Sequence, residues 1–147
     1  MSGPGRVLLV EDSEYDAELV LHALAKAGLA VELVLTQDGA EALDYLHERG
    51  RFAHRGGGMP VVVLLDIKLP KIDGLEVLQQ MRNHEALRRL PVVMLTSSRE
   101  DRDVTRSYDL GANAYVVKPV DFGDFMQAIR ASVAFWATVN QPPPVDS

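Results

Sequence analysis

The sequence contains no cysteine among its 147 residues, so neither a disulfide framework nor a thiolate metal site contributes to its fold. No apolar run approaches the roughly 20 residues that a membrane-spanning helix needs. The opening residues, Met-Ser-Gly-Pro-Gly-Arg, lack the apolar core of a secretory signal. We therefore expect a cytoplasmic protein without a membrane partner.

Positive charge is also scarce. The chain has 15 Lys and Arg against 21 Asp and Glu, a formal net charge of −6. This balance disfavours binding to a nucleic-acid phosphate backbone. With 47% hydrophobic residues over this length, the chain is expected to form one domain with a sizeable core.

Five short apolar segments alternate with five helical patterns along the chain. Alternation of this kind, joined by right-handed crossovers, predicts an α/β fold with a doubly wound parallel sheet and helices on both faces. We place the domain at 6–139, between an N-terminal tail at 1–5 and a Pro-rich tail at 140–147 that we expect to be disordered. The predicted strands are 6–10, 31–35, 61–65, 91–95 and 114–117, and the helices are 14–27, one from Asp38, one through Leu75 to Met81, 101–110 and 121–139.

The central segment runs from Pro60 to Gly74. Its unbroken apolar part, 61–65, is typical of a strand that is covered on both faces. Asp66 follows directly, at the carboxyl edge where open α/β sheets place their ligand sites. Asp66 could instead cap the next helix, but Asp73 lies closer to the start of that helix and fits the cap better.

Four of the five predicted strands end on residues that carry chemistry: Glu11 and Asp12, Asp66, Thr96, and Lys118. In a parallel sheet these strand ends meet at one edge. Crowded carboxylates repel one another unless a cation lies among them, and hard oxygen ligands suit Mg²⁺. Together with a lysine and a hydroxyl, this set predicts phosphoryl transfer to an aspartate.

From Arg6 to about Arg130 the chain resembles the receiver domains of two-component response regulators. The resemblance implies a flavodoxin-like sheet of order 2-1-3-4-5, and a signalling module, not a conventional enzyme, that phosphorylates and dephosphorylates itself with Mg²⁺. The residues that carry it are Glu11-Asp12, Leu64-Leu65-Asp66, Leu69-Pro70, Asp73-Gly74, Leu95-Thr96, Gly111-Ala112 and Lys118-Pro119.

The resemblance also implies a role for each site residue. Asp66 would accept the phosphoryl group and share the Mg²⁺. Asp12 would be a direct metal ligand, Glu11 would act through water, and the carbonyl of Lys68 would be the third protein ligand. Many family members have aspartate where this chain has Glu11; the longer side chain should still bind the metal.

Three further residues complete the implied site. Thr96 and Tyr115 would form the switch that responds to phosphorylation. Lys118 would contact the phosphoryl group, aimed by a cis bond to Pro119. Without the family context, Thr96 could be part of a helix cap, Tyr115 an ordinary core or half-exposed aromatic, and Lys118 a solvated lysine.

Four features resemble a narrower group, the stand-alone response regulators of bacterial phytochrome histidine kinases. This similarity implies a sensor histidine kinase, of the phytochrome type, as the partner. The features are Val10-Glu11-Asp12, the long loop before the third strand, Arg106-Ser107-Tyr108-Asp109-Leu110, and Phe135-Trp136.

Other functions stay open at this point. The chain could be an intermediate phosphate shuttle or sink in a relay. A phosphatase of the haloacid dehalogenase type also uses a strand-end aspartate, but it needs an acid two residues later, where this chain has Lys68. A flavodoxin-like FMN carrier would bring its phosphate against Glu11 and Asp12, which repel it.

The predicted last helix, 121–139, is longer than the sheet beneath it. Phe135 and Val139 fall opposite its inner stripe. With Tyr108 and Trp136 they predict a symmetric homodimer through the fourth helix, fifth strand and last helix. Alternatively, Phe135 and Trp136 fold back onto their own domain. The predicted inner stripe is Phe122, Phe125, Met126, Ile129, Val133 and Trp136.

Overall fold

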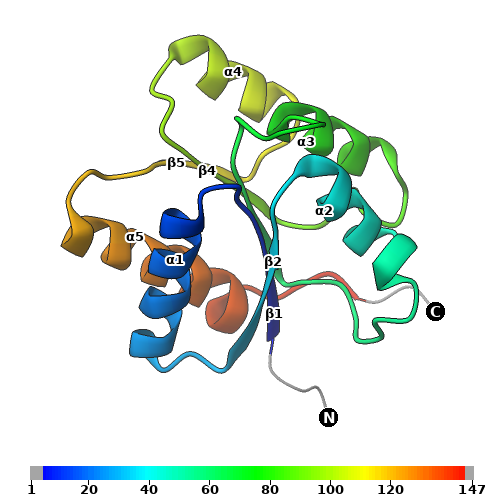
Figure 1. The fold of residues 1–147 in the computed structure, drawn as a ribbon. Helices are drawn as coiled ribbons and strands as arrows, with labels where there is room; N and C mark the ends of the chain where they lie inside the picture. The colour runs from blue at the N-terminus through cyan, green and yellow to red at the C-terminus, as the bar shows by residue number, and fades with distance from the viewer. Residues whose placement is uncertain (1–4, 145–147) are drawn as a thin grey trace.

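The five apolar segments lie side by side as parallel strands of one sheet, in the order β2-β1-β3-β4-β5 (Figure 1). The structure, a computed structural model, describes residues 5–144. The fold class and strand order are those predicted from the sequence. The strands are β1 (Gly5–Val10), β2 (Val31–Thr36), β3 (Val62–Leu65), β4 (Val92–Thr96) and β5 (Ala114–Val117).

Helices connect successive strands, with α1 and α5 on one face of the sheet and α2 and α3 on the other, the side on which α4 also lies (Figure 1). Four of the five begin at a residue whose side chain accepts the backbone N–H three positions on: Ser13, Asp38, Asp73 and Asp121. The helices are α1 (Glu14–Ala27), α2 (Gly39–Leu46), a 3₁₀ turn η1 (Gly50–Phe52), α3 (Gly74–Asn83), α4 (Asp101–Asp109), α5 (Phe122–Ala134) and a π-helical turn η2 (Phe135–Val139).

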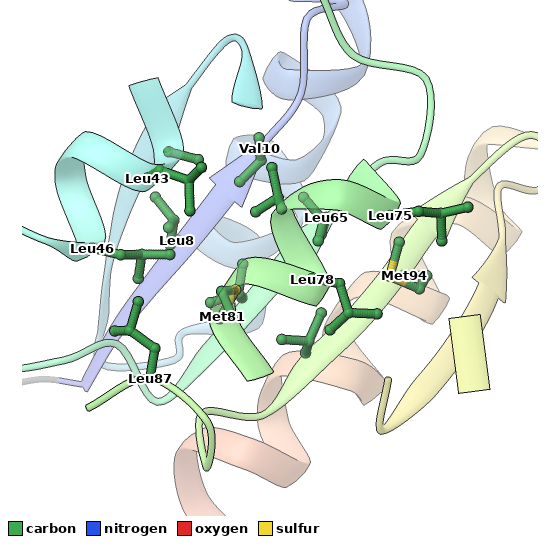
Figure 2. Packing of buried hydrophobic residues seen from close by; sticks show 14 of the residues in the cluster. Leu8, Val10, Leu43, Leu46, Leu65, Leu75, Leu78, Met81, Leu87 and Met94 are labelled. Atoms are coloured by element: carbon green, nitrogen blue, oxygen red, sulfur yellow. The ribbon is translucent and has the colours of Figure 1, made fainter. Parts of the chain in front are cut away.

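The core is divided in two by the sheet. Side chains alternate along each central strand, so Leu8 and Leu65 point to the α2–α3 face while Leu9 and Leu64 point to the α1–α5 face. Figure 2 shows the first layer, where side chains from α2 and α3 pack over the strands. Strands β3 and β4 are buried along their whole length, which fixes the position of the residues at and after their carboxyl ends.

The last helix departs from the prediction in two ways. Phe122 is 51% exposed and does not belong to the inner stripe, because it is the first residue of α5 and its ring lies beside His22 at 6.5 Å between centroids. The helix does continue to Val139, but its final turn is π-helical, with Asn140 N donating to Phe135 O at 2.8 Å. The predicted inner residue Trp136 is half-buried against the α1–α5 layer.

Two further expectations concern the ends of the chain and membranes. β1 begins at Gly5, one residue earlier than predicted, and 140–144 contain no helix or strand. The remaining tail residues, 1–4 and 145–147, lie outside the described residues. Within 5–144, no helix combines the length and the apolar character needed to cross a bilayer.

Candidate functional site

The predicted site residues meet at the carboxyl edge of the sheet, where β1, β3, β4 and β5 end. Their backbones are held by hydrogen bonds that continue the strand ladders past the last strand residue. The backbone of each of these site residues is therefore held as firmly as the sheet itself. The bonds are Glu11 N to Thr36 O at 3.0 Å, Asp66 N to Val10 O at 3.2 Å and Lys118 N to Thr96 O at 2.8 Å.

Lys118 lies at the centre of the site. Its Nζ donates to Glu11 Oε1 at 2.6 Å, to Asp16 Oδ2 at 2.8 Å and to Asp66 Oδ2 at 3.1 Å. The lysine side chain is only 8% exposed, so these three carboxylates take the place of water around the ammonium. An ammonium has three N–H donors, and all three are used.

Charge at the site is dominated by carboxylates. Burial raises the pKa of Glu11 above its usual range, and the nearby Asp66 raises it further against the opposing effect of Lys118. Burial alone would lower the pKa of Lys118, but its hydrogen bonds to Asp16 and Glu11 outweigh burial and raise that pKa. The site has more negative than positive charge.

Three of the carboxylates could hold a divalent cation. Glu11, Asp12 and Asp66 each offer one oxygen, and these oxygens lie within 4.8 Å of one another. Glu11 is buried and Asp12 is exposed, so the cluster is open to solvent on one side. Hard carboxylate oxygens at a solvent-accessible edge are the donors that suit Mg²⁺ or Mn²⁺.

Asp66 and the loop after it are tightly placed. Lys68 N approaches Asp66 Oδ1 at 3.4 Å, and Gly74 N donates to Ile67 O at 2.8 Å. A Cβ on Gly74 would lie 1.9 Å from the Asp66 carbonyl oxygen, so only glycine allows α3 to begin there. The role of the Lys68 carbonyl as a metal ligand stays a prediction.

Thr96 and Tyr115 are joined through Ser98. Thr96 Oγ1 accepts from Ser98 N at 3.3 Å, while the Tyr115 hydroxyl donates to Ser98 O at 3.0 Å. Ser98 Oγ donates to Asp103 Oδ2 in α4 at 2.6 Å. Ser98 therefore forms hydrogen bonds with Thr96 at the end of β4, with Tyr115 on β5 and with the first turn of α4.

Sequence reasoning missed Asp16. No motif in the sequence singles out Asp16, yet its carboxylate reaches Lys118 from the first turn of α1. Its position could have identified it, since residues in the first turn of a helix that follows a strand-end acid lie over the same edge of the sheet. The expected cis bond before Pro119 is wrong, because every peptide bond among the described residues is trans. The three carboxylates orient the ammonium instead.

Residues 7–130 match the family model of the response regulator receiver domain. The chain is 37% identical over 140 residues to the response regulator Rcp1 of Synechocystis sp., covering 95% of this chain and 94% of that protein. A structure of Rcp1 in its Mn²⁺-bound form superimposes with a TM-score of 0.88 over 96% of this chain and all of that one.

Two other structures extend the comparison. The bacteriophytochrome response regulator AtBRR is 56% identical, with a TM-score of 0.76 over 94% of this chain and 99% of that one. The phosphorylated cyanobacterial phytochrome response regulator RcpA is 35% identical, with a TM-score of 0.90 over 97% of this chain and all of that one. The match to the family model over most of the chain, together with these likenesses, shows that the chain belongs to the response regulator receiver family of two-component signalling proteins.

Proposed function

We propose that Asp66 accepts a phosphoryl group from a sensor histidine kinase and that the phosphorylated chain signals by a change of conformation. The observation that carries this proposal is the Lys118 ammonium, held 3.1 Å from Asp66 Oδ2 in a site with surplus negative charge. A carboxylate placed between a fixed ammonium and a cation-binding cluster is poised to attack a phosphoryl group.

In the transfer step, an Asp66 oxygen forms a bond to phosphorus as the bond from phosphorus to the kinase histidine nitrogen breaks. The imidazole nitrogen keeps the electron pair and takes a proton from solvent. Lys118 and the Thr96 hydroxyl would donate to phosphoryl oxygens. Glu11, Asp12, Asp66 and the Lys68 carbonyl would hold Mg²⁺, which when bound offsets the charge of the phosphoryl oxygens. Attack by water on phosphorus would later restore Asp66.

Label transfer tests the acceptor. The wild-type chain should gain hydroxylamine-sensitive phosphate from an autophosphorylated histidine kinase only when Mg²⁺ is present, and Asp66→Asn should gain none. Asp109→Asn is a matched control, because it removes one exposed carboxylate from α4, outside the site. Labelling of Asp66→Asn at the wild-type level would refute the assignment.

The kinase is proposed to be of the bacterial phytochrome type, since Rcp1, RcpA and AtBRR are so similar to this chain. A hollow of about 300 Å³ beside Lys118 offers a place for the donor, with Tyr15, Val120 and Phe122 exposed around it. Transfer from a panel of kinases should be fastest from a phytochrome kinase. Equal rates from unrelated sensor kinases would contradict this pairing.

The switch is proposed to run through Thr96 and Tyr115. If the Thr96 hydroxyl turns to the phosphoryl group, it releases Ser98 N, and Ser98 in turn contacts Tyr115 and α4. Thr96→Ala should therefore still be phosphorylated but should leave the amide NMR shifts of α4 and β5 close to their unphosphorylated values. A wild-type shift pattern in phosphorylated Thr96→Ala would exclude this coupling.

A symmetric homodimer through α4, β5, α5 and η2 is also proposed. Tyr108, Phe135 and Val139 are 49%, 45% and 70% exposed, whereas Trp136 packs half-buried on its own domain. Light scattering at tens of micromolar should give a dimer for the wild type and a monomer for Phe135→Glu. Leu21→Glu, an exposed position on α1, is the control and should stay dimeric. A monomeric wild type, phosphorylated or not, would refute the dimer.

A further inference from the structure

One carboxylate at the site belongs neither to the metal cluster nor to the proposed phosphoryl acceptor. Asp16, the third residue of α1, brings Oδ2 to 2.8 Å from Lys118 Nζ. This is shorter than the 3.1 Å contact between Lys118 and Asp66 itself. The Asp16 side chain is 24% exposed, so it lies at the mouth of the site and shields the ammonium from solvent on the α1 side.

Capping of α1 does not explain where this side chain points. In a capping box, a Glu or Gln three positions after an N-cap serine folds back to the N–H of that serine, and Asp16 occupies that position. Here Ser13 N donates to Glu11 Oε2 at 3.1 Å, so that N–H is already satisfied. The serine cap uses only the backbone of Asp16, whose N donates to Ser13 Oγ at 3.2 Å. The Asp16 carboxylate is therefore free to pair with Lys118.

The three partners of Lys118 differ in their other tasks. Glu11 and Asp66 also belong to the cluster whose oxygens could hold a divalent cation, and Asp16 does not. Asp66 is in addition the proposed phosphoryl acceptor. When a cation and a phosphoryl group occupy the site, Asp16 is the one carboxylate of the three that can keep its contact with the ammonium unchanged.

We propose that Asp16 is the positioning residue for Lys118: it holds the ammonium beside Asp66 while Glu11 and Asp66 are engaged by Mg²⁺ and the phosphoryl group. This inference rests on the proposed function of Asp66. It assigns Asp16 no contact with the phosphoryl group. Without Asp16, the ammonium would be tied only to carboxylates that Mg²⁺ also attracts, and like charge would drive it out of the site.

Asp16→Ala tests the proposal, with Glu14→Ala as the matched control. Glu14 is an exposed acid in the same turn of α1, so its removal changes the net charge equally while sparing Lys118. Asp16→Ala keeps the backbone bond to Ser13, and circular dichroism of the full chain checks that α1 is retained. Asp16→Asn serves as a second, isosteric variant, and Asp16→Glu should restore most of the wild-type behaviour.

The first readout is the ¹⁵N NMR signal of the Lys118 ammonium, which needs no phosphorylation. In the wild type and in Glu14→Ala it should stay sharp when Mg²⁺ is added, because solvent exchange is slow. In Asp16→Ala and Asp16→Asn it should vanish on addition of Mg²⁺. An ammonium signal that survives Mg²⁺ in these two variants would overturn the proposal.

The second readout is the rate of phosphoryl transfer at saturating Mg²⁺, which removes any effect on metal affinity. Loss of the charged hydrogen bond that holds Lys118 beside the phosphoryl group predicts a rate about tenfold lower for Asp16→Ala. Glu14→Ala should stay within about twofold of the wild type. A wild-type rate for Asp16→Ala would also overturn the proposal. A wild-type chain that accepts no phosphoryl group would instead refute the function of Asp66, and the NMR readout would still decide on Asp16.

Discussion

Helices α3 and α4 each follow a strand that ends at the site, but they are attached to the protein very differently. α3 buries Leu75, Val77, Leu78 and Met81 in the core layer. α4 buries only Ser107, whose hydroxyl donates to Asp103 O within its own helix at 2.7 Å. In Figure 1, α4 extends away from the sheet at the top of the molecule.

The difference separates a fixed wall of the site from a movable one. Displacing α3 would expose apolar side chains and open cavities in the core, whereas displacing α4 would cost little buried area. The strand next to α4 follows the same trend, since all four residues of β5 are only half-buried while all five of β4 are buried. The core therefore fixes the position of Asp66, whereas the α4–β5 face can be displaced at little cost in buried area.

The largest expected effect comes from cutting into α3. Leu78→Ala should lower the free energy of unfolding by about 3 kcal/mol, because it leaves a cavity in a fully buried layer. Val104→Ala in α4, where the side chain is half-buried, should cost less than about 1 kcal/mol. Urea unfolding of both variants measures the contrast, and equal losses would erase the distinction between the two helices.

Hydrogen exchange should reveal the same contrast without any substitution. Amides of α3 should exchange only through global unfolding, and those of α4 through local opening that costs at least about 2 kcal/mol less. The expected ranking follows from the burial of the two helices. If α4 amides were protected as strongly as those of α3, the helix could not be the movable wall.

Arg82 ties the movable region to the fixed one and gives the next effect. From the end of α3, its guanidinium donates to Gly111 O at 3.0 Å, Arg88 O at 3.1 Å and Asn113 Oδ1 at 3.1 Å. Arg82→Met keeps the aliphatic stem but removes these donors, and should cost about 2 kcal/mol of stability.

Thermal or urea unfolding would measure the loss, with Arg88→Met as the control. Arg88 is exposed on the turn after α3, so its substitution should change stability by less than about 0.5 kcal/mol. Arg82→Met should also make the amides of the α4–β5 turn exchange faster while those of α3 stay protected. Unchanged exchange in that turn would show that the guanidinium does not restrain it.

The smallest expected effect concerns Tyr115. Tyr115→Phe removes the hydrogen bond to Ser98 O and should lower stability by about 1 kcal/mol at neutral pH. Burial raises the pKa of the Tyr115 phenol above its ordinary value of 10.0. The phenol's contribution is therefore complete below pH 10 and is lost as the pH rises through the raised pKa. The stability gap between wild type and Tyr115→Phe should shrink above pH 10, and a gap that persists there would contradict this assignment.

Most of the fold could be predicted because its signals are local. Short, mainly apolar segments predict the strands, and Ser13, Asp38, Asp73 and Asp121 are the capping residues at the predicted helix starts. The end of the chain was harder. Helical periodicity cannot show that Phe122 is exposed, because periodicity gives the direction of a side chain and not whether another element covers it at the first residue of the helix.

The sequence predicts which strand-end residues form the site, but it does not predict the side-chain contacts between them. Thr96 ends a strand and Glu11, Asp66 and Lys118 each follow one, so the topology alone brings them together. The contact of Asp16 with Lys118 joins residues 102 positions apart and depends on a side chain that a capping pattern would assign elsewhere. The bond before Pro119 is trans where the family resemblance implies cis, and the Lys118 ammonium is held by its three carboxylate partners.

The loop from Ile67 to Asp73 has almost no slack, because both of its supports rely on a missing Cβ. A Cβ on Gly39 would lie 1.9 Å from Ile72 O, and one on Gly74 would lie 1.9 Å from Asp66 O. Lys68 lies in this loop, so these two close contacts also restrict the backbone that carries the Lys68 carbonyl. Binding of a cation there should then cost little conformational entropy, and its affinity should reflect charge and desolvation more than the closing of a loop.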